Sequence, residues 1–183
     1  MTEQFTDHVA HRPTEPIAGA VITVSDRCAA GTEEDTSGPL AVRLLAEYGV
    51  ENRDLIVVPD EVDHIASALQ EALSAGARII LTTGGTGISP RDCTPEATKP
   101  YISTHLDGLA HEIRLRGLKS TPLACLSRGL VGITARGAGG SLIVNAPGSN
   151  GGVQDTVEVL GPVLGHIIEQ LSGPAHPKAD EAK

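Results

Sequence analysis

Aromatic side chains are nearly absent from this chain, and so is any excess of positive charge. Of its 183 residues 2% are aromatic, none is tryptophan, and the formal net charge is −9 at pH 7. Proteins that read nucleic acid normally present basic patches and stacking aromatics, so this class of function is disfavoured. The negative charge also gives no attraction to anionic lipid, and any bound anion has to be held by local groups.

Cysteines and long apolar runs are scarce as well. The three cysteines, Cys28, Cys93 and Cys125, lie far apart without CxxC spacing, which suggests neither a disulfide framework nor a structural zinc site. No apolar run reaches the length of a membrane span, and residues 1–8 lack the basic start and apolar stretch of a secretory signal. We therefore expect a protein that stays in a reducing cytoplasm.

The chain instead has aliphatic side chains in short blocks. Hydrophobic residues make up 40% of the sequence and charged residues 20%, which is typical of a globular protein. A core of Val, Ile, Leu and Ala suits strands buried on both faces beneath crossover helices. The length favours one domain, which we place at 17–172, between polar tails at 1–16 and 173–183 that we expect to be flexible.

Strand and helix patterns alternate along this domain. Strands are predicted at 18–24, 55–58, 79–82 and 141–145, short apolar segments at 123–126 and 129–133, and helices at 37–48, 62–73, 95–98, 109–118 and 153–171. This alternation predicts an α/β fold with a mostly parallel sheet and right-handed crossovers.

The most informative segment is the glycine-rich turn after the third predicted strand. The turn consists of Gly84, Gly85, Thr86 and Gly87. Such a turn at the carboxyl edge of a sheet presents backbone N–H groups to an anion. It lacks the Gly-Lys-Ser/Thr ending of a Walker A loop and does not match GxGxxG. Taken alone, it is interpreted equally well as a tight strand-to-helix connection.

Arg91 and Asp92, a few residues further on, favour the phosphate interpretation. Arginine binds a phosphate through two N–H groups at once, and aspartate coordinates Mg²⁺ or orients a nucleophile. Both residues follow the N–H-rich turn closely. The sequence therefore predicts an anion site here.

Polar residues also follow the other long predicted strands, and the carboxyl ends of parallel strands meet at one edge of a sheet. These residues are Ser25 and Asp26, then Asp60, and finally Asn145, Pro147 and Gly148. Each has a plainer interpretation: Asp60 has the position of a helix N-cap, as does Ser37, and the last group is ordinary turn sequence. Ser127 and Arg128 offer a hydroxyl and a guanidinium to an anion, or form only a polar connection.

A few chemically capable residues receive the plain interpretation. His105, His111 and Glu112 lack HExxH spacing and are predicted to be solvated helix positions. Cys93 has no assignable partner base and is predicted to be a small buried residue rather than a nucleophile.

Taken in order, these motifs resemble one family. They are residues 82–87 with Arg91 and Asp92, the Thr-Pro-Glu-Ala-Thr run at 94–98, the Pro-Asp-Glu run at 59–61, residues 126–129 and the turn at 145–148. Together they closely resemble the molybdopterin adenylyltransferase family of molybdenum cofactor biosynthesis, which includes a domain of gephyrin. The resemblance extends from about Gly19 to Ser172 and implies a three-layer α/β/α fold and a homotrimer.

The resemblance also implies a reaction. Members bind molybdopterin and activate its phosphate with Mg-ATP, which releases pyrophosphate and forms adenylylated molybdopterin, here for a downstream molybdate-insertion protein. Asp60 and Asp92 fall on the catalytic aspartates, and we expect them to hold Mg²⁺. Substrate-binding roles fall on Gly84, Gly85, Thr86, Gly87, Ser127, Asn145, Pro147 and Gly148, with Ser25 and Asp26 on the nucleotide side and Arg91 steadying the anions. Nucleotidyl transfer suits these residues because it needs mainly positioning and neutralisation of phosphate charge.

Two other functions compete with adenylylation. One is a non-catalytic molybdopterin-binding or carrier protein, against which the presence of both Asp60 and Asp92 counts, since a pure binder has no need of two acidic groups beside an anionic ligand. The other is a scaffolding trimer, against which the shortness of the two tails counts. One departure from the family concerns residues 149–152, which stand where a second proline often follows the Asn-x-Pro-Gly turn, and we expect a more mobile loop there.

Overall fold

The computed structural model describes residues 15–173, so the two predicted tails lie almost entirely outside the described residues. Its strands are β1 (Ile17–Val24), β2 (Val50–Val58), β3 (Ile79–Thr83), β4 (Thr104–His105), β5 (Val131–Ile133) and β6 (Leu142–Ala146). Its α-helices are α1 (Asp26–Ala29), α2 (Ser37–Ala46), α3 (Val62–Ser74), α4 (Thr94–Thr98), α5 (Asp107–Gly117) and α6 (Asn150–Ser172). Two 3-10 helices, η1 (Lys99–Tyr101) and η2 (Pro122–Leu126), complete the description.

The strands form one sheet in the order β2-β1-β3-β6-β5-β4. The pairs β1–β2, β1–β3 and β3–β6 are parallel, whereas β4–β5 and β5–β6 are antiparallel. The predicted mostly parallel α/β fold is confirmed. From β1 the chain moves to β2 on one side and then crosses to β3 on the other, so the connections reverse between β1 and β3. In open sheets of this kind, ligands bind outside the carboxyl ends of the strands at such a reversal.

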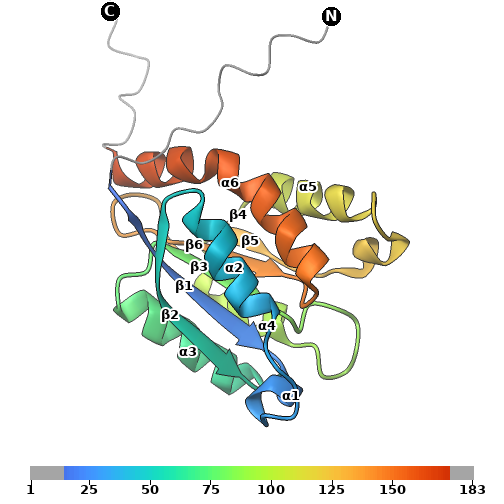
Figure 1. Cartoon of the computed structure of the whole chain (residues 1–183). Helices are drawn as coiled ribbons and strands as arrows, with labels where there is room; N and C mark the ends of the chain where they lie inside the picture. Colours follow the sequence, from blue (N-terminus) through green and yellow to red (C-terminus); the bar gives the residue numbers. More distant parts are fainter. Residues whose placement is uncertain (1–14, 174–183) are drawn as a thin grey trace, which may run out of the picture.

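Helices cover both faces of the sheet, which gives three layers (Figure 1). One buried cluster joins a face of the sheet to α2, α5 and α6, and includes Leu45, Ile113 and Leu160. The other joins the opposite face to α3 and α4, and includes Ile65 and Leu69. Successive side chains of a strand point to opposite faces, which is why the central strands carry continuous aliphatic runs. Each fully buried leucine or isoleucine contributes about 1.5–3 kcal/mol of stability.

Some boundaries differ from the sequence-based expectations. β2 begins at Val50 rather than at residue 55, because the backbone of its polar first half pairs with β1 from Ile17 onward. α6 begins at Asn150 rather than at residue 153: the Ser149 side chain accepts a hydrogen bond from the Gly152 N–H (3.1 Å), so residues 150–152 form the first helical turn instead of a loop. Of the two short apolar segments, 123–126 lies in η2, and 129–133 contains β5.

Within residues 15–173, no helix is both long and apolar enough to cross a membrane.

Candidate active site

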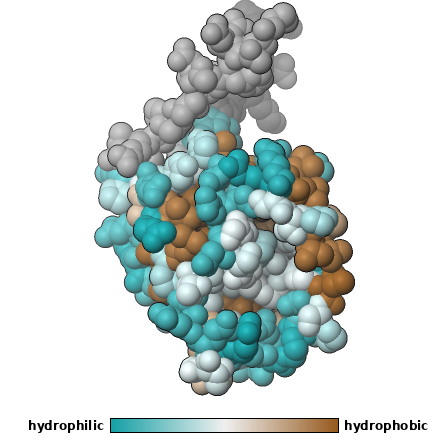
Figure 2. Space-filling view, turned by 45° about the vertical axis from the view of Figure 1, so that its right-hand side comes forward, coloured by the Kyte–Doolittle hydropathy of each residue, from teal (hydrophilic) through white to brown (hydrophobic). Residues whose placement is uncertain are grey.

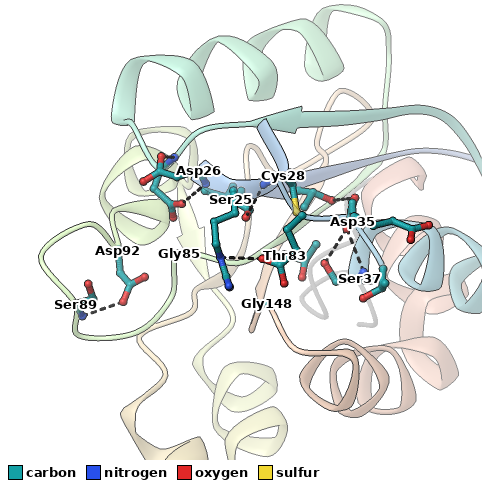
Figure 3. Close-up of a pocket in the computed structure, with 17 residues that line it drawn as sticks. Ser25, Asp26, Cys28, Asp35, Ser37, Thr83, Gly85, Ser89, Asp92 and Gly148 are labelled. Carbon is teal, nitrogen blue, oxygen red and sulfur yellow. Dashed lines mark hydrogen bonds and ion pairs between the residues drawn. The ribbon is translucent and has the colours of Figure 1, made fainter. Parts of the chain in front are cut away.

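A cavity of about 520 Å³ opens at the strand reversal, outside the carboxyl ends of β1, β2 and β3. Figure 3 shows its labelled residues extending from Ser89 and Asp92 at one end to Asp35 and Ser37 at the other. Six of the side chains that line it are carboxylates, namely Asp26, Glu33, Glu34, Asp35, Asp60 and Asp92. Among the described residues that line it, Arg27 is the one lysine or arginine, and it is paired with Glu33 at 2.8 Å. We call this the acidic cavity.

Asp26 and Asp60 bind each other reciprocally at the ends of β1 and β2. The Asp26 N–H donates to Asp60 Oδ2 (2.9 Å), and the Asp60 N–H donates to Asp26 Oδ1 (3.0 Å). The N-cap position of α3 belongs to Glu61, so the plain interpretation of Asp60 as a helix cap is wrong. The pairing of β1 with β2 instead aligns two residues 34 positions apart and fixes the Asp60 carboxylate in the cavity.

Arg91 lies against Asp26 in a two-pronged ion pair. Its Nε donates to Asp26 Oδ2 at 3.0 Å and its Nη2 to Asp26 Oδ1 at 2.7 Å. The hydrogen bond from Arg91 is the largest cause of an Asp26 pKa below its usual value, and the same bond raises the pKa of Arg91. Both side chains are about half exposed. The Arg91 guanidinium is therefore bound to Asp26, and its contact with a phosphate stays a prediction.

The Asp60 carboxylate carries negative charge that its surroundings do not fully offset. Partial burial is the largest cause that raises the pKa of Asp60, and the charges of Asp26 and Asp92 raise it further. The Asp26 N–H and the more distant Arg91 act in the opposite direction. Asp92 lies on the loop after the glycine turn and accepts the Ser89 N–H through Oδ2 (2.9 Å). The two predicted catalytic aspartates are thus brought into one cavity.

The donor set of the acidic cavity fits a hard cation that arrives with phosphate. Among the described residues, no three His, Cys, Asp or Glu side chains are grouped as a metal site. Mg²⁺ is usually held by one or two carboxylates together with substrate phosphates rather than by an all-protein cage. Asp60 and Asp92 supply two carboxylates, and their excess charge is what a divalent cation would offset.

The glycine turn packs directly against this site. Gly84 and Gly85 have φ of 101° and 61°, in the left-handed region that glycine tolerates. A Cβ on Gly84 would stand 2.1 Å from the Val24 carbonyl oxygen. A Cβ on Gly85 would stand 2.3 Å from Thr94 Oγ1 and 3.0 Å from Asp60 Oδ1. The Thr94 hydroxyl donates to the Gly84 carbonyl at 2.9 Å, so the turn lies between the end of β1 and the start of α4.

A second cavity of about 360 Å³ lies on the other side of this turn, and we call it the apolar cavity. Its lining comes from α5, η2 and the start of α6, together with the glycine turn and the turn at 145–148. The lining residues include Ile113, Gly117, Leu123, Ala124, Leu126, Asp155, Thr86, Gly87, Ser127 and Pro147. Leu123 is 67% exposed and Leu126 is 43% exposed. Figure 2, in which the right-hand side of Figure 1 comes forward, shows a group of hydrophobic side chains along the right-hand edge of its view.

The two cavities share their walls. In the glycine turn, Gly85 lines the acidic cavity and Gly87 lines the apolar cavity. In the 145–148 turn, Gly148 lines the acidic cavity and Pro147 lines the apolar cavity. The Thr83 hydroxyl donates to the Pro147 carbonyl at 3.0 Å and joins the two turns. Of the predicted site residues, the acidic cavity receives Ser25, Asp26, Gly85, Asp60, Asp92 and Gly148, and the apolar cavity receives Thr86, Gly87, Ser127 and Pro147.

Asn145 lies apart from both cavities as a buried side chain. Its Nδ2 donates to the hydroxyls of Thr82 and Thr98, both at 3.0 Å, and its Oδ1 accepts the Leu130 N–H at 3.1 Å. All three bonds of the Asn145 amide are therefore made within the protein, and they hold the first residue of the 145–148 turn in place. A ligand contact for Asn145 stays a prediction.

Arg128 has a role that the sequence left open between anion binding and a polar connection. Its Nε donates to the Gly87 carbonyl (2.6 Å), its Nη2 donates to the Asp92 carbonyl (2.7 Å), and its Nη1 pairs with Glu96. The hydrogen bond from Arg128 is the largest cause of a lowered Glu96 pKa. Arg128 thus clamps the loop that carries Asp92. The sequence offered no local signal for this, because the bonded residues lie 32 to 41 positions away.

Asp35 is a site residue that the sequence analysis did not single out. Its Oδ1 accepts the N–H groups of Ser37 (3.1 Å) and Gly38 (2.9 Å), and its Oδ2 accepts the Thr23 hydroxyl (2.7 Å). Asp35 rather than Ser37 therefore satisfies the start of α2, and the predicted N-cap role of Ser37 is wrong. An aspartate just ahead of a helix was the available signal.

The residues given a plain interpretation lie mostly as expected. His111 and Glu112 are exposed on α5, as predicted, whereas His105 is exposed on the strand β4 and not on a helix. Cys93 is half-buried against the core, and its burial is the main cause of a raised thiol pKa, which disfavours the reactive thiolate.

Comparison with known proteins agrees with this geometry. Residues 20–166 match the family model described as a probable molybdopterin binding domain. The molybdopterin adenylyltransferase of Helicobacter pylori is 34% identical over 156 residues, which cover 84% of this chain and 86% of that protein. The structure of the tungsten cofactor synthesizing protein MoaB from Pyrococcus furiosus superposes with a TM-score of 0.81 at 32% identity, over 86% of this chain and 98% of that one.

Longer relatives contain a similar segment. The molybdenum cofactor synthesis protein cinnamon of Drosophila melanogaster is 41% identical over 160 residues, which are 86% of this chain but 26% of that protein. Overall, the chain spans between 24% and 51% of the length of four of the curated relatives it matches. The family match, the shared fold and the motifs that build the two cavities together show that this chain belongs to the molybdopterin-binding domain family of molybdenum cofactor biosynthesis.

Proposed function

We propose that this protein adenylylates molybdopterin with Mg-ATP. The observation that carries the proposal is the pair of cavities that meet at the glycine turn and at the 145–148 turn. A carrier needs one binding site, whereas a transferase needs two that face the same point. The acidic cavity suits a polyphosphate that arrives with a cation, and the apolar cavity suits a flat ring system.

The reaction is a displacement at phosphorus. An oxygen of the molybdopterin phosphate attacks the α-phosphorus of ATP and forms a new P–O bond. The bond from that phosphorus to the oxygen bridging toward the β-phosphate breaks, and its electron pair leaves with pyrophosphate. The protein contributes positioning and charge stabilisation rather than a covalent intermediate.

The residues of the site would divide these tasks. N–H groups of the turn and the Arg91 guanidinium would bind phosphate oxygens, while Arg128 keeps the 87–92 loop in place. Asp60 and Asp92 would hold Mg²⁺, which when bound neutralises phosphate charge and makes the α-phosphorus more electrophilic. Asp26 would keep Asp60 oriented through the reciprocal N–H bonds.

Assembly and location are part of the same proposal. We expect a homotrimer in the cytoplasm that passes adenylylated molybdopterin to a molybdate-insertion protein. Light scattering on purified protein measures the oligomer directly, and a monomer at micromolar concentration would contradict that part of the proposal without touching the chemistry.

The test separates binding from transfer. Calorimetric titration measures molybdopterin affinity, and a pyrophosphate-release assay with Mg-ATP measures turnover in wild type, Asp60→Asn and Asp92→Asn. We expect release by wild type and a loss of about 10²-fold or more in each variant, with molybdopterin affinity largely kept. Asp54→Asn is the matched control, because Asp54 is exposed on β2 and lines neither cavity.

Each other outcome has a definite meaning. Tight molybdopterin binding by wild type without pyrophosphate would make the protein a carrier. Absence of binding would overturn the assignment of the substrate, and wild-type turnover in Asp92→Asn would overturn the role of that aspartate.

A further inference from the structure

We infer that Asp155 determines specificity for the pterin ring, by accepting hydrogen bonds from the ring's amino-pyrimidinone edge inside the apolar cavity. The inference rests on the proposed function, since it concerns how the second substrate is recognised.

Asp155 is the one carboxylate among the residues that line the apolar cavity. It lies on α6, one and a half turns from the helix start, and its side chain is 20% exposed. The other residues that line the cavity include Ile113, Leu123 and Ala124. A carboxylate in such apolar surroundings is costly unless a partner offsets the loss of hydration, so its position calls for an explanation.

The two carboxylate oxygens of Asp155 face different surroundings. Oδ1 lies 3.5 Å from Arg116 Nε, an ion-pair distance that is longer than a good hydrogen bond. A Cβ on Gly117 would stand 3.6 Å from Oδ2. Gly117 and Asp155 both line the cavity. Because position 117 carries no side chain, nothing at this position stands between the cavity and the carboxylate.

Four other polar side chains of the cavity are hydrogen-bonded inside the protein. The hydroxyls of Thr121, Ser127 and Ser149 accept backbone N–H groups at 3.3, 3.3 and 3.1 Å. Arg114 donates to the Gly129 carbonyl at 3.2 Å. Because Asp155 is the one carboxylate among the lining residues, it offers the strongest acceptor that an entering ring would meet.

A guanidinium on α5 lies beside the Asp155 carboxylate. Arg116 on α5 faces it and also pairs with Glu158, one turn further along α6. An ionised carboxylate only accepts hydrogen bonds, through two oxygens side by side. This matches a ring edge that presents two adjacent N–H donors, as the N3–H and 2-amino groups of a pterin do, in the manner of a guanidinium fork.

The expected discrimination follows from the cost of unmatched polar groups. A site built to hydrogen-bond a donor rejects an analogue that lacks it, because buried groups are then left unpaired. Replacing the pterin 2-amino group by a carbonyl, as in lumazine, would place an oxygen against the Asp155 carboxylate. The apolar walls alone would accept both rings equally.

The test compares these two rings by fluorescence titration, using 6-hydroxymethylpterin and 6-hydroxymethyllumazine as probes. Wild type is expected to bind the pterin at least about tenfold more tightly. Asp155→Asn should lose this preference, because its amide offers one acceptor and a donor that suits the lumazine carbonyl. Glu158→Gln removes the other carboxylate partner of Arg116 and should keep the preference.

Two further measurements protect the result. Asp155→Ser is the second variant should Asp155→Asn unfold, and thermal unfolding of each variant reports on the fold. An unchanged pterin preference in a folded Asp155 variant would overturn the inference, and so would a wild type that binds both rings equally or neither. Pyrophosphate release is measured on the same samples: if wild type releases none but discriminates through Asp155, the proposed function fails and the inference stands.

Discussion

The acidic and apolar cavities lie on either side of the same two turns, yet they are built by opposite means. The acidic cavity is lined mainly by residues at the ends of strands and in the loops after them, six of them carboxylates. The apolar cavity is lined mainly by side chains of α5, η2 and α6. Charge limits what can enter the first, because an anion needs a cation with it. Shape and hydrogen bonding at one carboxylate limit what can enter the second.

This contrast gives the shared wall particular importance. The glycine turn contributes Gly85 to one cavity and Gly87 to the other. A change in the wall should therefore disturb both cavities, whereas a change in either lining should disturb one. Substitutions in the shared wall, in the acidic cavity and in the apolar cavity therefore distinguish the contributions of the two cavities.

Gly84→Ala is expected to have the largest effect, because it combines backbone strain with a collision. The residue has φ of 101°, and its new Cβ would stand 2.1 Å from the Val24 carbonyl oxygen, a backbone atom that cannot swing away. We expect the free energy of unfolding to fall by about 3 kcal/mol or more, and both ATP and molybdopterin binding to weaken. Urea denaturation and calorimetric titration measure these effects.

Gly76→Ala is the matched control for strain alone. Its φ is 84°, and a Cβ there would meet nothing within 4 Å. A loss of about 1–2 kcal/mol without a change in ligand binding is expected. Equal losses in the two variants would mean that the turn is not held against β1.

Local sequence patterns were sufficient to predict the sheet edge. The aliphatic runs that end at Val24 and Thr83, and the turn chemistry at Gly84 and Gly148, are properties of short segments. Once parallel strands are inferred, their carboxyl ends must meet, so Asp26, Asp60 and Asp92 could be placed near one another before any coordinates were known.

Contacts across long separations could not be predicted in this way. Arg91 lies on Asp26, 65 positions earlier, and Arg128 clamps the loop before Asp92. Both contacts depend on the conformation of loops, which the periodicity of hydrophobic residues does not predict. Asn145 points inward because it pairs in register with Thr82. The apolar cavity was missed entirely as a cavity, since it forms only when α5, η2 and α6 pack together.

Ala124→Phe is expected to have an intermediate effect confined to the apolar cavity. Ala124 lines this cavity from η2, and a phenyl ring there would take up part of its roughly 360 Å³. We expect molybdopterin affinity to fall about tenfold, or about 1.4 kcal/mol, while ATP affinity changes less than about twofold. Calorimetric titration with each ligand measures both. Leu118→Phe, at a 42% exposed position that lines neither cavity, is the control, and a matched loss of ATP affinity in Ala124→Phe would show that the cavities are not independent.

Asp60→Asn is expected to have the smallest effect on stability and the most informative sign. The pKa of Asp60 is raised above 3.8, chiefly by burial, so the folded state favours the protonated acid. The charge therefore costs stability once the pH rises through the folded pKa, and costs nothing well below 3.8. Removing it should stabilise the variant by about 0.5 kcal/mol at pH 7.5, a small value because solvent screens the partly exposed group, and the gain should shrink toward pH 4. Thermal unfolding at several pH values measures this gain.

Asp26→Asn should instead lower the stability at pH 7.5, because Arg91 lowers the pKa of Asp26 and the ionised form is the one that the fold favours. If both variants shifted the unfolding temperature in the same direction at pH 7.5, the two carboxylates would not be divided as described, into one held by Arg91 and one left for a cation.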